Sequence, residues 1–429
     1  MSDAAADRAG LAARKAALAI FSQVQRQRRP LDTQLDSLKN LPPRDAGFAR
    51  ALASESLRHF GALDAVVRHF VPKPLPPHKA GPATEILMLG ACELLILKVA
   101  PHAAVDAAND LASADNKAVH FKSLINAVLR RIAREGEAVR AGRDTPRLNT
   151  PDWLWSRWAA QYGDNIARRI AEAHAKEAPL DITLKRTDAV HPESVPLFGL
   201  SRRVSDQARV EDLAGFADGG WWVQDVAATL PVALLGDVAG KRVIDLCAAP
   251  GGKSLQLAAR GAEVTAVEMD SVRAGRIREN LERTGLNAHV VQSDVRDFQG
   301  TAPLVLLDAP CTATGTIRRH PDLPWIKSAA DVTAQAAVAY DLLESAAAMV
   351  EPDGLLVFSV CSLEREEGEE QIASFLAAHP EFARVPVTAP EVFNHAEWIS
   401  PQGDLRTLPC HLSEIGGMDG FYAARLRRL

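Results

Sequence analysis

Short apolar segments alternate with helical stretches in the C-terminal half of the chain, and this alternation limits the possible folds more than any other feature. Five segments rich in Val and Leu read as strands buried on both faces of a parallel sheet: 242–246, 263–268, 289–293, 304–308 and 355–360. Helical patterns lie between them, notably over 271–285 and 332–350. The alternation predicts a doubly wound, Rossmann-like α/β domain over residues 231–429.

The first 140 residues carry helical patterns alone. Apolar residues recur at helical spacing, and breakers such as PKPLPP (72–77) separate the stretches. An all-α bundle is therefore predicted for residues 1–140. The segment that follows, 141–151, is polar and rich in breakers, and DITLKR (181–186) has strand character. Residues 141–230 are interpreted as a linker with a small α+β connecting domain.

Composition excludes several classes of protein. Of 429 residues, 47% are hydrophobic and 24% are charged, as in ordinary soluble chains, and no apolar run reaches membrane-spanning length. The first ten residues carry acids where a signal peptide has bases. Five dispersed cysteines do not suggest a secreted disulfide framework. We therefore expect a cytoplasmic protein without membrane contact.

Charge is distributed unevenly along the chain. Residues 1–150 contain 22 Lys and Arg against 15 Asp and Glu, whereas the remainder contains 27 against 39. A basic first part fits a module that approaches nucleic acid, and it fits a solvated helical surface equally well.

Ligands of open α/β sheets bind beyond the carboxyl ends of the strands, and polar groups follow the first three predicted strands. The first strand runs into DLCAAPGGKS (245–254), whose two glycines let the backbone approach a ligand. The loop lacks the G-x-G-x-x-G fingerprint, and Cys247 stands where a P-loop needs glycine. Dinucleotide and ATP binding are therefore disfavoured.

Acidic residues follow the second and third strands. Glu268, seventeen residues after Gly251, is placed to accept hydrogen bonds from ribose hydroxyls, with Asp270 as the alternative. Asp294 is similarly placed for an adenine amino group. A lone strand-end Glu can also be an exposed carboxylate without a ligand. Together the three strand ends predict an adenosine-containing ligand, and S-adenosylmethionine suits a loop without a phosphate cradle.

Two cysteines follow the fourth and fifth strands. If these strands are neighbours, Cys311, Cys361 and Asp308 meet, because adjacent strands lie about 5 Å apart. Buried apolar cysteines and a disulfide are the alternatives. A thiolate that adds to C6 of a cytosine makes C5 nucleophilic toward a sulfonium methyl. A protonated Asp308 could hydrogen-bond N3, and the second thiol could assist release; spacing does not say which thiol attacks.

At these motifs the chain resembles a known family. DLCAAPGGKS, DAPCTATG (308–315) with IRRHPDLPW (317–325), and SVCSLEREEGEEQI (359–372) are similar to motifs of the RNA cytosine-5 methyltransferases. The chain most resembles the bacterial 16S ribosomal RNA methyltransferases of the Sun/RsmB type. APHAAVDAANDLA (100–112) and INAVLRR (125–131) resemble the NusB-like RNA-binding domain that is fused to that subfamily.

The resemblance implies roles for individual residues. The cofactor loop is Cys247, Ala248, Ala249, Pro250, Gly251, Gly252 and Lys253. Glu268 takes the ribose, Asp294 the adenine, and Asp308 borders both cofactor and target base. The family's nucleophile follows the fifth strand, which implies Cys361, while Cys311 assists release. Thr312, Arg365 and Gly368 depart from the Ser, Pro and Asn that are usual in relatives.

Other features carry weaker expectations. Arg318 and Arg319 are expected to contact RNA phosphates, and Trp325 is expected to pack rather than stack on a base. The acidic run 364–370 is expected to be an exposed first helical turn. The histidines show no metal-ligand spacing, so no metal is expected. The sequence does not fix the oligomeric state, although a monomer is expected.

The combined hypothesis is a methyltransferase that modifies an unstacked cytosine of small-subunit ribosomal RNA. Two alternatives stay open. One is a methyltransferase that acts on an amino group of RNA or protein and needs no thiol. The other is a non-enzymatic RNA-binding factor built around the N-terminal bundle.

Overall fold

The computed structural model describes residues 3–205 and 209–429, which form two compact units. The first unit comprises Met1–Lys176 and Ile317–Ser328, and the second comprises Glu177–Thr316 and Ala329–Leu429. The predicted connector, 141–230, is thus divided between the units, and a three-domain division stays a prediction. None of the described helices is both long enough and apolar enough to cross a membrane.

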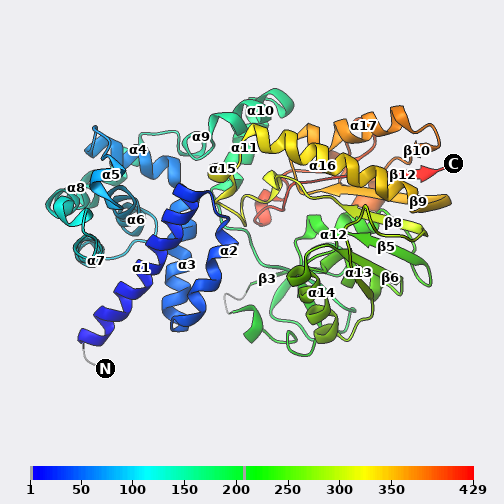
Figure 1. The fold of residues 1–429 in the computed structure, drawn as a ribbon, viewed down its shortest axis with the longest axis horizontal. Helices are drawn as coiled ribbons and strands as arrows, with labels where there is room; N and C mark the ends of the chain where they lie inside the picture. Colours follow the sequence, from blue (N-terminus) through cyan, green and yellow to red (C-terminus); the bar gives the residue numbers. More distant parts are fainter. Residues whose placement is uncertain (1–2, 206–208) are drawn as a thin grey trace. The chain divides into compact units, whose positions relative to one another are not determined.

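Every regular element described in the first unit is a helix, which confirms the predicted all-α bundle (Figure 1). Proline at the first helical position starts α3, α5 and α7, since its fixed φ suits a helix start and no N–H is needed there. The elements are α1 (Asp3–Gln27), α2 (Leu31–Leu35), η1 (Asp36–Asn40), α3 (Pro43–Arg58), α4 (Phe60–Phe70), α5 (Pro77–Ala80), α6 (Ala83–Leu95), α7 (Pro101–Ser113), η2 (Ala118–Phe121), α8 (Lys122–Ala141), α9 (Thr145–Leu148), α10 (Asp152–Tyr162), α11 (Asp164–His174) and α15 (Leu323–Ile326). Helix α6 is the centre of the bundle, because all but one of its residues are buried.

A segment from the predicted methyltransferase part of the chain belongs to the helical unit. Ile317–Ser328, which contains α15, is grouped with the first unit. The Trp325 indole N–H donates to the Leu57 carbonyl at 2.9 Å, and its ring lies 4.6 Å from that of Phe60. The expectation that Trp325 packs is therefore confirmed.

Replacing Trp325 by alanine is expected to lower the free energy of unfolding by about 2 kcal/mol, less than a fully buried tryptophan would, because the ring is half-buried. Phenylalanine keeps the ring contact and loses only the hydrogen bond, so it costs about 1 kcal/mol. Urea unfolding of the full chain, followed by circular dichroism, measures both. Wild-type unfolding midpoints for both variants would contradict the packing role.

The second unit contains two sheets. The smaller is antiparallel, with the order β2-β3-β1-β4. The larger has the order β10-β12-β9-β8-β5-β6-β7, and β11 pairs with β12. The strands are β1 (Asp181–Leu184), β2 (Ser194–Pro196), β3 (Ser201–Val204), β4 (Trp221–Val223), β5 (Arg242–Leu246), β6 (Glu263–Glu268), β7 (His289–Gln292), β8 (Ala302–Asp308), β9 (Val350–Val360), β10 (Phe382–Arg384), β11 (Leu405–Thr407) and β12 (Phe421–Arg428). The five predicted strands are β5 to β9, and all pair in parallel, whereas β12 is antiparallel to β9.

Helices cover both faces of the large sheet, as a doubly wound fold requires. Neighbouring residues of β5 point to opposite faces: Val243 packs in one hydrophobic cluster and Ile244 in another. The first cluster includes residues of α12 (Val226–Ala233), α13 (Gly252–Ala259) and α14 (Ser271–Thr284). The second includes residues of α16 (Ala329–Ala348) and α17 (Glu369–Ala378). The short helical turns of this unit are η3 (Val210–Asp212), η4 (Thr314–Thr316), η5 (Arg365–Glu367), η6 (Ala389–Val392), η7 (Ala396–Trp398) and η8 (Ser413–Ile415).

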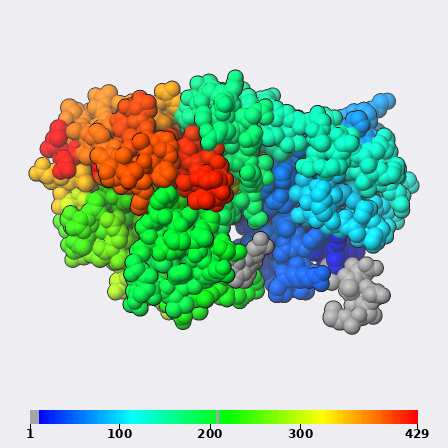
Figure 2. Space-filling view, turned by 180° about the vertical axis from the view of Figure 1, so that it is seen from behind, coloured from blue at the N-terminus to red at the C-terminus, as the bar shows by residue number. Residues whose placement is uncertain are grey.

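The C-terminal segment is tied to the small sheet. Arg203 of β3 forms a buried ion pair with Asp181 of β1 at 2.7 Å and donates to the Gly417 carbonyl at 2.8 Å. Asp225 accepts the Asp419 N–H at 3.0 Å. Figure 2 shows the C-terminal residues, in red, on the same face of the molecule as the green residues of the region that contains the small sheet. These buried polar contacts hold the loop that leads into β12.

Candidate active site

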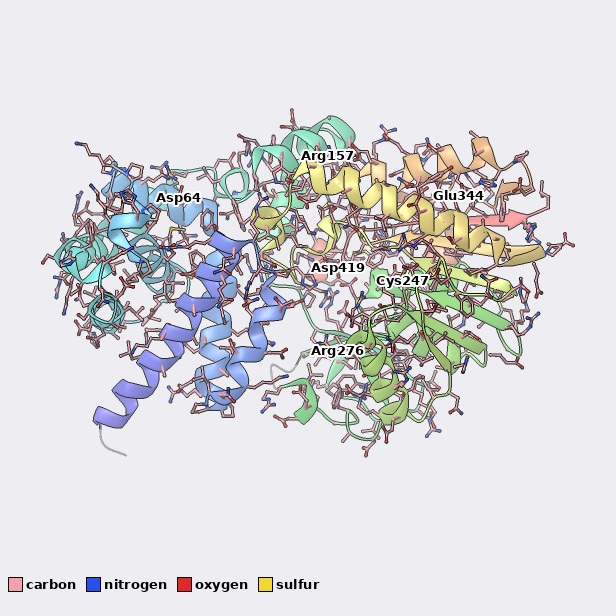
Figure 3. The ribbon with its side chains drawn as sticks, in the orientation of Figure 1. Asp64, Arg157, Cys247, Arg276, Glu344 and Asp419 are labelled. Carbon is pink, nitrogen blue, oxygen red and sulfur yellow. The ribbon has the colours of Figure 1, made fainter. Side chains whose placement is uncertain are left out.

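The loop after β5 makes a tight turn at the carboxyl edge of the large sheet. It contains Cys247, labelled in Figure 3, and reaches α13 through Gly251. Gly251 has φ +105°, a backbone conformation that residues with a side chain rarely adopt. A Cβ there would also lie 3.4 Å from Ile277 of α14. That distance is an ordinary van der Waals contact, so the positive φ is what favours glycine at this turn.

Glu268 lies beside this turn, at the end of β6. Its side chain is buried, and its two carboxylate oxygens accept the N–H groups of Ala249 at 3.3 Å and Asp270 at 3.1 Å. A carboxylate has about four acceptor positions, so it can still accept hydrogen bonds from ribose hydroxyls. The Asp270 side chain instead caps α14 by accepting the Arg273 N–H. The geometry therefore favours Glu268 over Asp270 for this role.

Asp294, after β7, forms an ion pair with Arg296 at 2.6 Å. Hydrogen bonds from the Arg296 side chain and backbone lower the pKa of the Asp294 carboxyl to about 2. Two apolar side chains near this edge, Met269 and Val272, are 65% and 67% exposed. Neither residue is singled out by the sequence pattern.

Replacing Glu268 by alanine is expected to weaken S-adenosylmethionine binding about 10- to 100-fold, because hydrogen bonds to a charged group contribute about 1.5–3 kcal/mol. Isothermal titration calorimetry of the full chain measures the dissociation constant. The matched control is Glu263→Ala, which removes an exposed acid from the opposite end of β6. Equal affinities for the two variants would exclude the ribose role of Glu268.

Asp308, at the end of β8, is paired with Lys253. The Lys253 ammonium lies 2.7 Å from one Asp308 oxygen, and the Ser359 hydroxyl donates to the other at 2.9 Å. Burial lowers the pKa of Lys253, but neighbouring acidic groups, Asp308 first and then Asp245, more than offset this, so the pKa is raised overall. Both Asp308 oxygens accept hydrogen bonds, the pattern of an ionised carboxylate. A proton on Asp308 for N3 of a base stays a prediction.

The two thiols at the ends of β8 and β9 lie in contact. Asp308 and Ser359 are register partners in these neighbouring strands, and the Sγ atoms of Cys311 and Cys361 are 3.5 Å apart. Both cysteines are free thiols in the structure, which does not contain the alternative disulfide between them. The hydrogen bond with Cys361 and burial raise the pKa of the Cys311 thiol well above its usual value. Burial raises the pKa of the Cys247 thiol to about 12, which leaves Cys247 unreactive.

Two expectations about charged residues are wrong. Arg318 is 1% exposed, so its side chain is buried rather than presented to RNA, and its carbonyl accepts a hydrogen bond from Arg58 at 2.9 Å. Arg319 is partly exposed, and its phosphate contact stays a prediction. The acidic run 364–370 is not uniformly exposed, because Glu364 and Glu367 are fully buried and accept hydrogen bonds from hydroxyl groups.

The sheet order is that of a Rossmann-like fold, and the comparison with known families gives the class of protein: a methyltransferase that uses S-adenosylmethionine. The family model of the 16S rRNA methyltransferases RsmB/F matches residues 232–427, and that of the NusB family matches residues 11–134. The chain belongs to the RsmB/F family of RNA methyltransferases.

Individual relatives agree with this assignment. Ribosomal RNA small subunit methyltransferase B of Thermus thermophilus is 37% identical over 90% of both chains. The protein of the same name from Pseudomonas putida is 33% identical over 98% of both chains. Among solved structures, PH0851 has a TM-score of 0.75 and 23% identity over 98% of both chains. NSun6 from Pyrococcus horikoshii, solved with SFG, has a TM-score of 0.55 and 18% identity, covering 65% of this chain and 98% of that one. The two structures support the fold.

The residues at this edge fit S-adenosylmethionine. The buried Glu268 carboxylate suits a ribose diol, and the exposed Met269 suits an adenine face. The Gly251 turn permits close approach of the backbone without a phosphate cradle.

Proposed function

We propose that the protein methylates C5 of a cytosine in 16S rRNA through a transient bond between Cys361 Sγ and C6 of the base. The observation that carries this proposal is the contact of two free thiols, 3.5 Å apart, beside Asp308 at the carboxyl edge of the sheet. Methyl transfer to an amino group needs no thiol. The thiol pair therefore favours the carbon target over the amino-group alternative.

The first step is attack by Cys361. Its thiolate forms a bond to C6, and the C5=C6 electron pair becomes available at C5. When bound, S-adenosylmethionine would supply the methyl group from its sulfonium: C5 would bond to that carbon as the sulfur–methyl bond breaks, the electron pair would stay on sulfur, and S-adenosylhomocysteine would leave. Lys253, where the loop after β5 enters α13, is paired with Asp308 at the end of β8, and we assign both residues to orienting the base by hydrogen bonding. Both ring faces must be reached, so the cytosine is single-stranded or flipped out.

Release requires the C5 proton and the sulfur to leave. The proton passes to water, its bonding pair restores C5=C6, and the C6–S bond breaks with its electron pair returning to Cys361. Cys311 stays protonated because its pKa is raised, and its S–H donates a hydrogen bond to the departing thiolate. Cys361 is thus the nucleophile, and Cys311 assists release.

We also propose the cofactor contacts, the RNA-binding unit, the oligomeric state and the location of the protein. We assign the cofactor to Cys247, Ala248, Ala249, Pro250, Gly251, Gly252, Lys253, Glu268, Asp294 and Asp308. The helical unit, which carries the excess of basic residues, binds RNA near the target, with Arg319 as one contact. We place the protein as a monomer in the cytoplasm, together with its ribosomal substrate.

The test is methyl transfer from labelled S-adenosylmethionine to 16S rRNA taken from cells that lack the protein. Digestion and mass spectrometry should find one 5-methylcytosine, and 16S rRNA from cells that contain the protein should accept no label. An N-methylated nucleoside or labelled protein would instead favour the amino-group alternative. Binding of RNA without any transfer would favour the RNA-binding factor.

A further inference from the structure

A fully buried carboxylate, Glu367, connects the loops that carry the two thiols. It follows Cys361 by six residues, on the turn η5. One carboxylate oxygen accepts the Thr312 N–H at 2.7 Å, and the other accepts the Thr312 hydroxyl at 2.6 Å. The Ser362 hydroxyl donates to the second oxygen as well. Glu367 therefore binds the residues next to Cys311 and next to Cys361 at once.

Further buried contacts join the same two loops. The Gly315 N–H donates to the Cys361 carbonyl at 3.0 Å, and the Leu363 N–H donates to the Thr314 hydroxyl at 3.0 Å. A Cβ at Gly315 would lie 2.9 Å from the Cys361 carbonyl oxygen and 2.0 Å from that of Gly420. The two loops therefore pack so closely at Gly315 that a side chain would not fit there. Among the contacts described, Glu367 is the only acidic side chain that accepts a hydrogen bond from Thr312.

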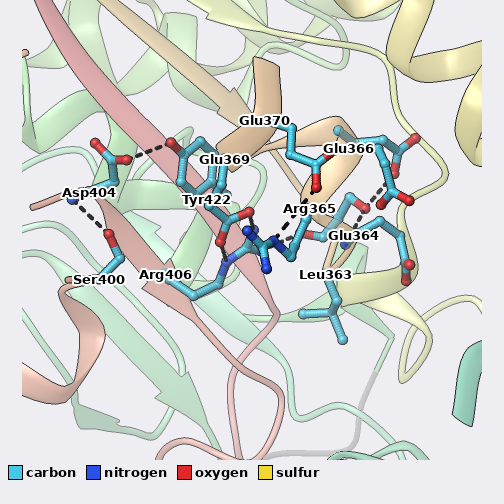
Figure 4. A network of polar contacts seen from close by, with 12 residues as sticks. Leu363, Glu364, Arg365, Glu366, Glu369, Glu370, Ser400, Asp404, Arg406 and Tyr422 are labelled. Carbon is cyan, nitrogen blue, oxygen red and sulfur yellow. Dashed lines mark hydrogen bonds and ion pairs between the residues drawn. The ribbon is translucent and has the colours of Figure 1, made fainter. Parts of the chain in front are cut away.

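Arg406 binds the residues on both sides of the turn that carries Glu367. Arg406 of β11 donates to the Ser362 carbonyl and forms a two-point ion pair with Glu369 at 2.7 and 3.1 Å (Figure 4). Its guanidinium lies 4.9 Å from the Tyr422 ring centroid. A Cβ at position 368 would lie 2.9 Å from Arg406 and 3.0 Å from Tyr422, so Gly368 allows this packing.

We propose that Glu367 is a positioning residue for release: through Thr312 and Ser362 it holds the Cys311 thiol against Cys361. This rests on the proposed function, in which the Cys311 thiol assists the departure of Cys361 from the base. A carboxylate suits the task because it accepts three hydrogen bonds from one side chain. Ser and Thr both supply the hydroxyl it needs at position 312, which explains why Thr312 fits where relatives usually have Ser.

The first readout is the covalent complex with RNA. Glu367→Ala removes the acceptor of both Thr312 hydrogen bonds and of the Ser362 hydroxyl, but Arg406 still binds the Ser362 carbonyl beside Cys361, so attack continues while release slows. We expect a 10- to 100-fold lower kcat together with a covalent protein–RNA complex that accumulates as in Cys311→Ala. Glu367→Gln keeps an acceptor for the Thr312 N–H and a donor for a hydroxyl, and should restore release to within about threefold. A loss of kcat without the complex would overturn the proposal.

The second readout measures thiol proximity without catalysis. Diamide oxidises neighbouring thiols to a disulfide, and peptide mass spectrometry measures the rate of Cys311–Cys361 cross-linking. We expect cross-linking to slow at least tenfold in Glu367→Ala and in Thr312→Val, which removes one hydroxyl and is the alternative if the first variant does not fold. The control is Glu370→Ala, an exposed acid of the same run, which should match the wild type.

The two readouts separate the hypotheses. Slow cross-linking in Glu367→Ala without a trapped complex in Cys311→Ala would support the positioning and contradict the proposed role of Cys311. A trapped complex in Cys311→Ala with unchanged cross-linking in Glu367→Ala would leave the proposed function intact and exclude Glu367.

Discussion

Replacing Cys361 by alanine is expected to reduce methyl transfer to RNA by roughly 10³-fold or more, the scale on which enzymes lose activity with their nucleophile. Without the sulfur, no bond forms at C6, and C5 stays a poor nucleophile whatever the position of the methyl donor. Cys361 lies 3.5 Å from Cys311, which cannot substitute well because its raised pKa keeps it protonated. Initial rates with labelled S-adenosylmethionine and 16S rRNA measure the effect.

Two controls make this loss specific. The variant should bind S-adenosylmethionine with wild-type affinity, because Cys361, at the end of β9, is not among the proposed cofactor contacts, which follow β5, β6, β7 and β8. Its circular dichroism spectrum should be unchanged. Activity within tenfold of the wild type would instead assign the enzyme to the methyltransferases that modify amino groups.

The strands and the edge they form could be predicted from local sequence. Buried parallel strands are apolar throughout, so β5 to β9 stand out, and the residue that ends each strand is fixed to the same edge. This is why pattern and position placed Glu268, Asp308 and the two cysteines at one edge, without separating Cys361 from Cys311. β10 and β11 have only three residues each, and segments so short leave no periodic pattern.

Tertiary contacts account for what the sequence pattern missed. The segment Ile317–Ser328 looks like a continuation of the methyltransferase motifs, yet Trp325 packs with Phe60 and Leu57 in the helical unit. Arg318 is buried with it. Likewise, Glu367 reads as a solvated charge until Thr312, 55 residues earlier, is placed against it. Pairings at such separations depend on the assembled fold.

The sequence pattern alone could not decide which of the two thiols attacks the base. Position alone left Cys311 and Cys361 equivalent, and the family resemblance selected Cys361. In the structure, the Cys361 hydrogen bond and burial raise the pKa of the Cys311 thiol, and the charge of Glu367 raises it further. A thiol that stays protonated suits a hydrogen-bond donor during release better than an attacking group.

Replacing Cys311 by alanine is expected to trap the enzyme on its RNA. The variant keeps the Cys361 nucleophile, so the bond to C6 forms and methylation of C5 proceeds. It lacks the thiol whose Sγ lies 3.5 Å from Cys361 Sγ, so the departing thiolate loses the hydrogen-bond donor proposed for it. We expect at least a tenfold larger fraction of RNA to migrate with the protein in denaturing gel electrophoresis, with turnover reduced in proportion.

The trapped species must depend on the attacking sulfur. The double variant that lacks both thiols should form no complex, and Cys311→Ser, which retains a hydroxyl donor, should accumulate less of it than Cys311→Ala. Digestion of the complex should leave a nucleotide attached to the peptide that contains Cys361. If Cys361→Ala trapped RNA and Cys311→Ala did not, the two roles would be exchanged, and the protonated Cys311 thiol would no longer explain release.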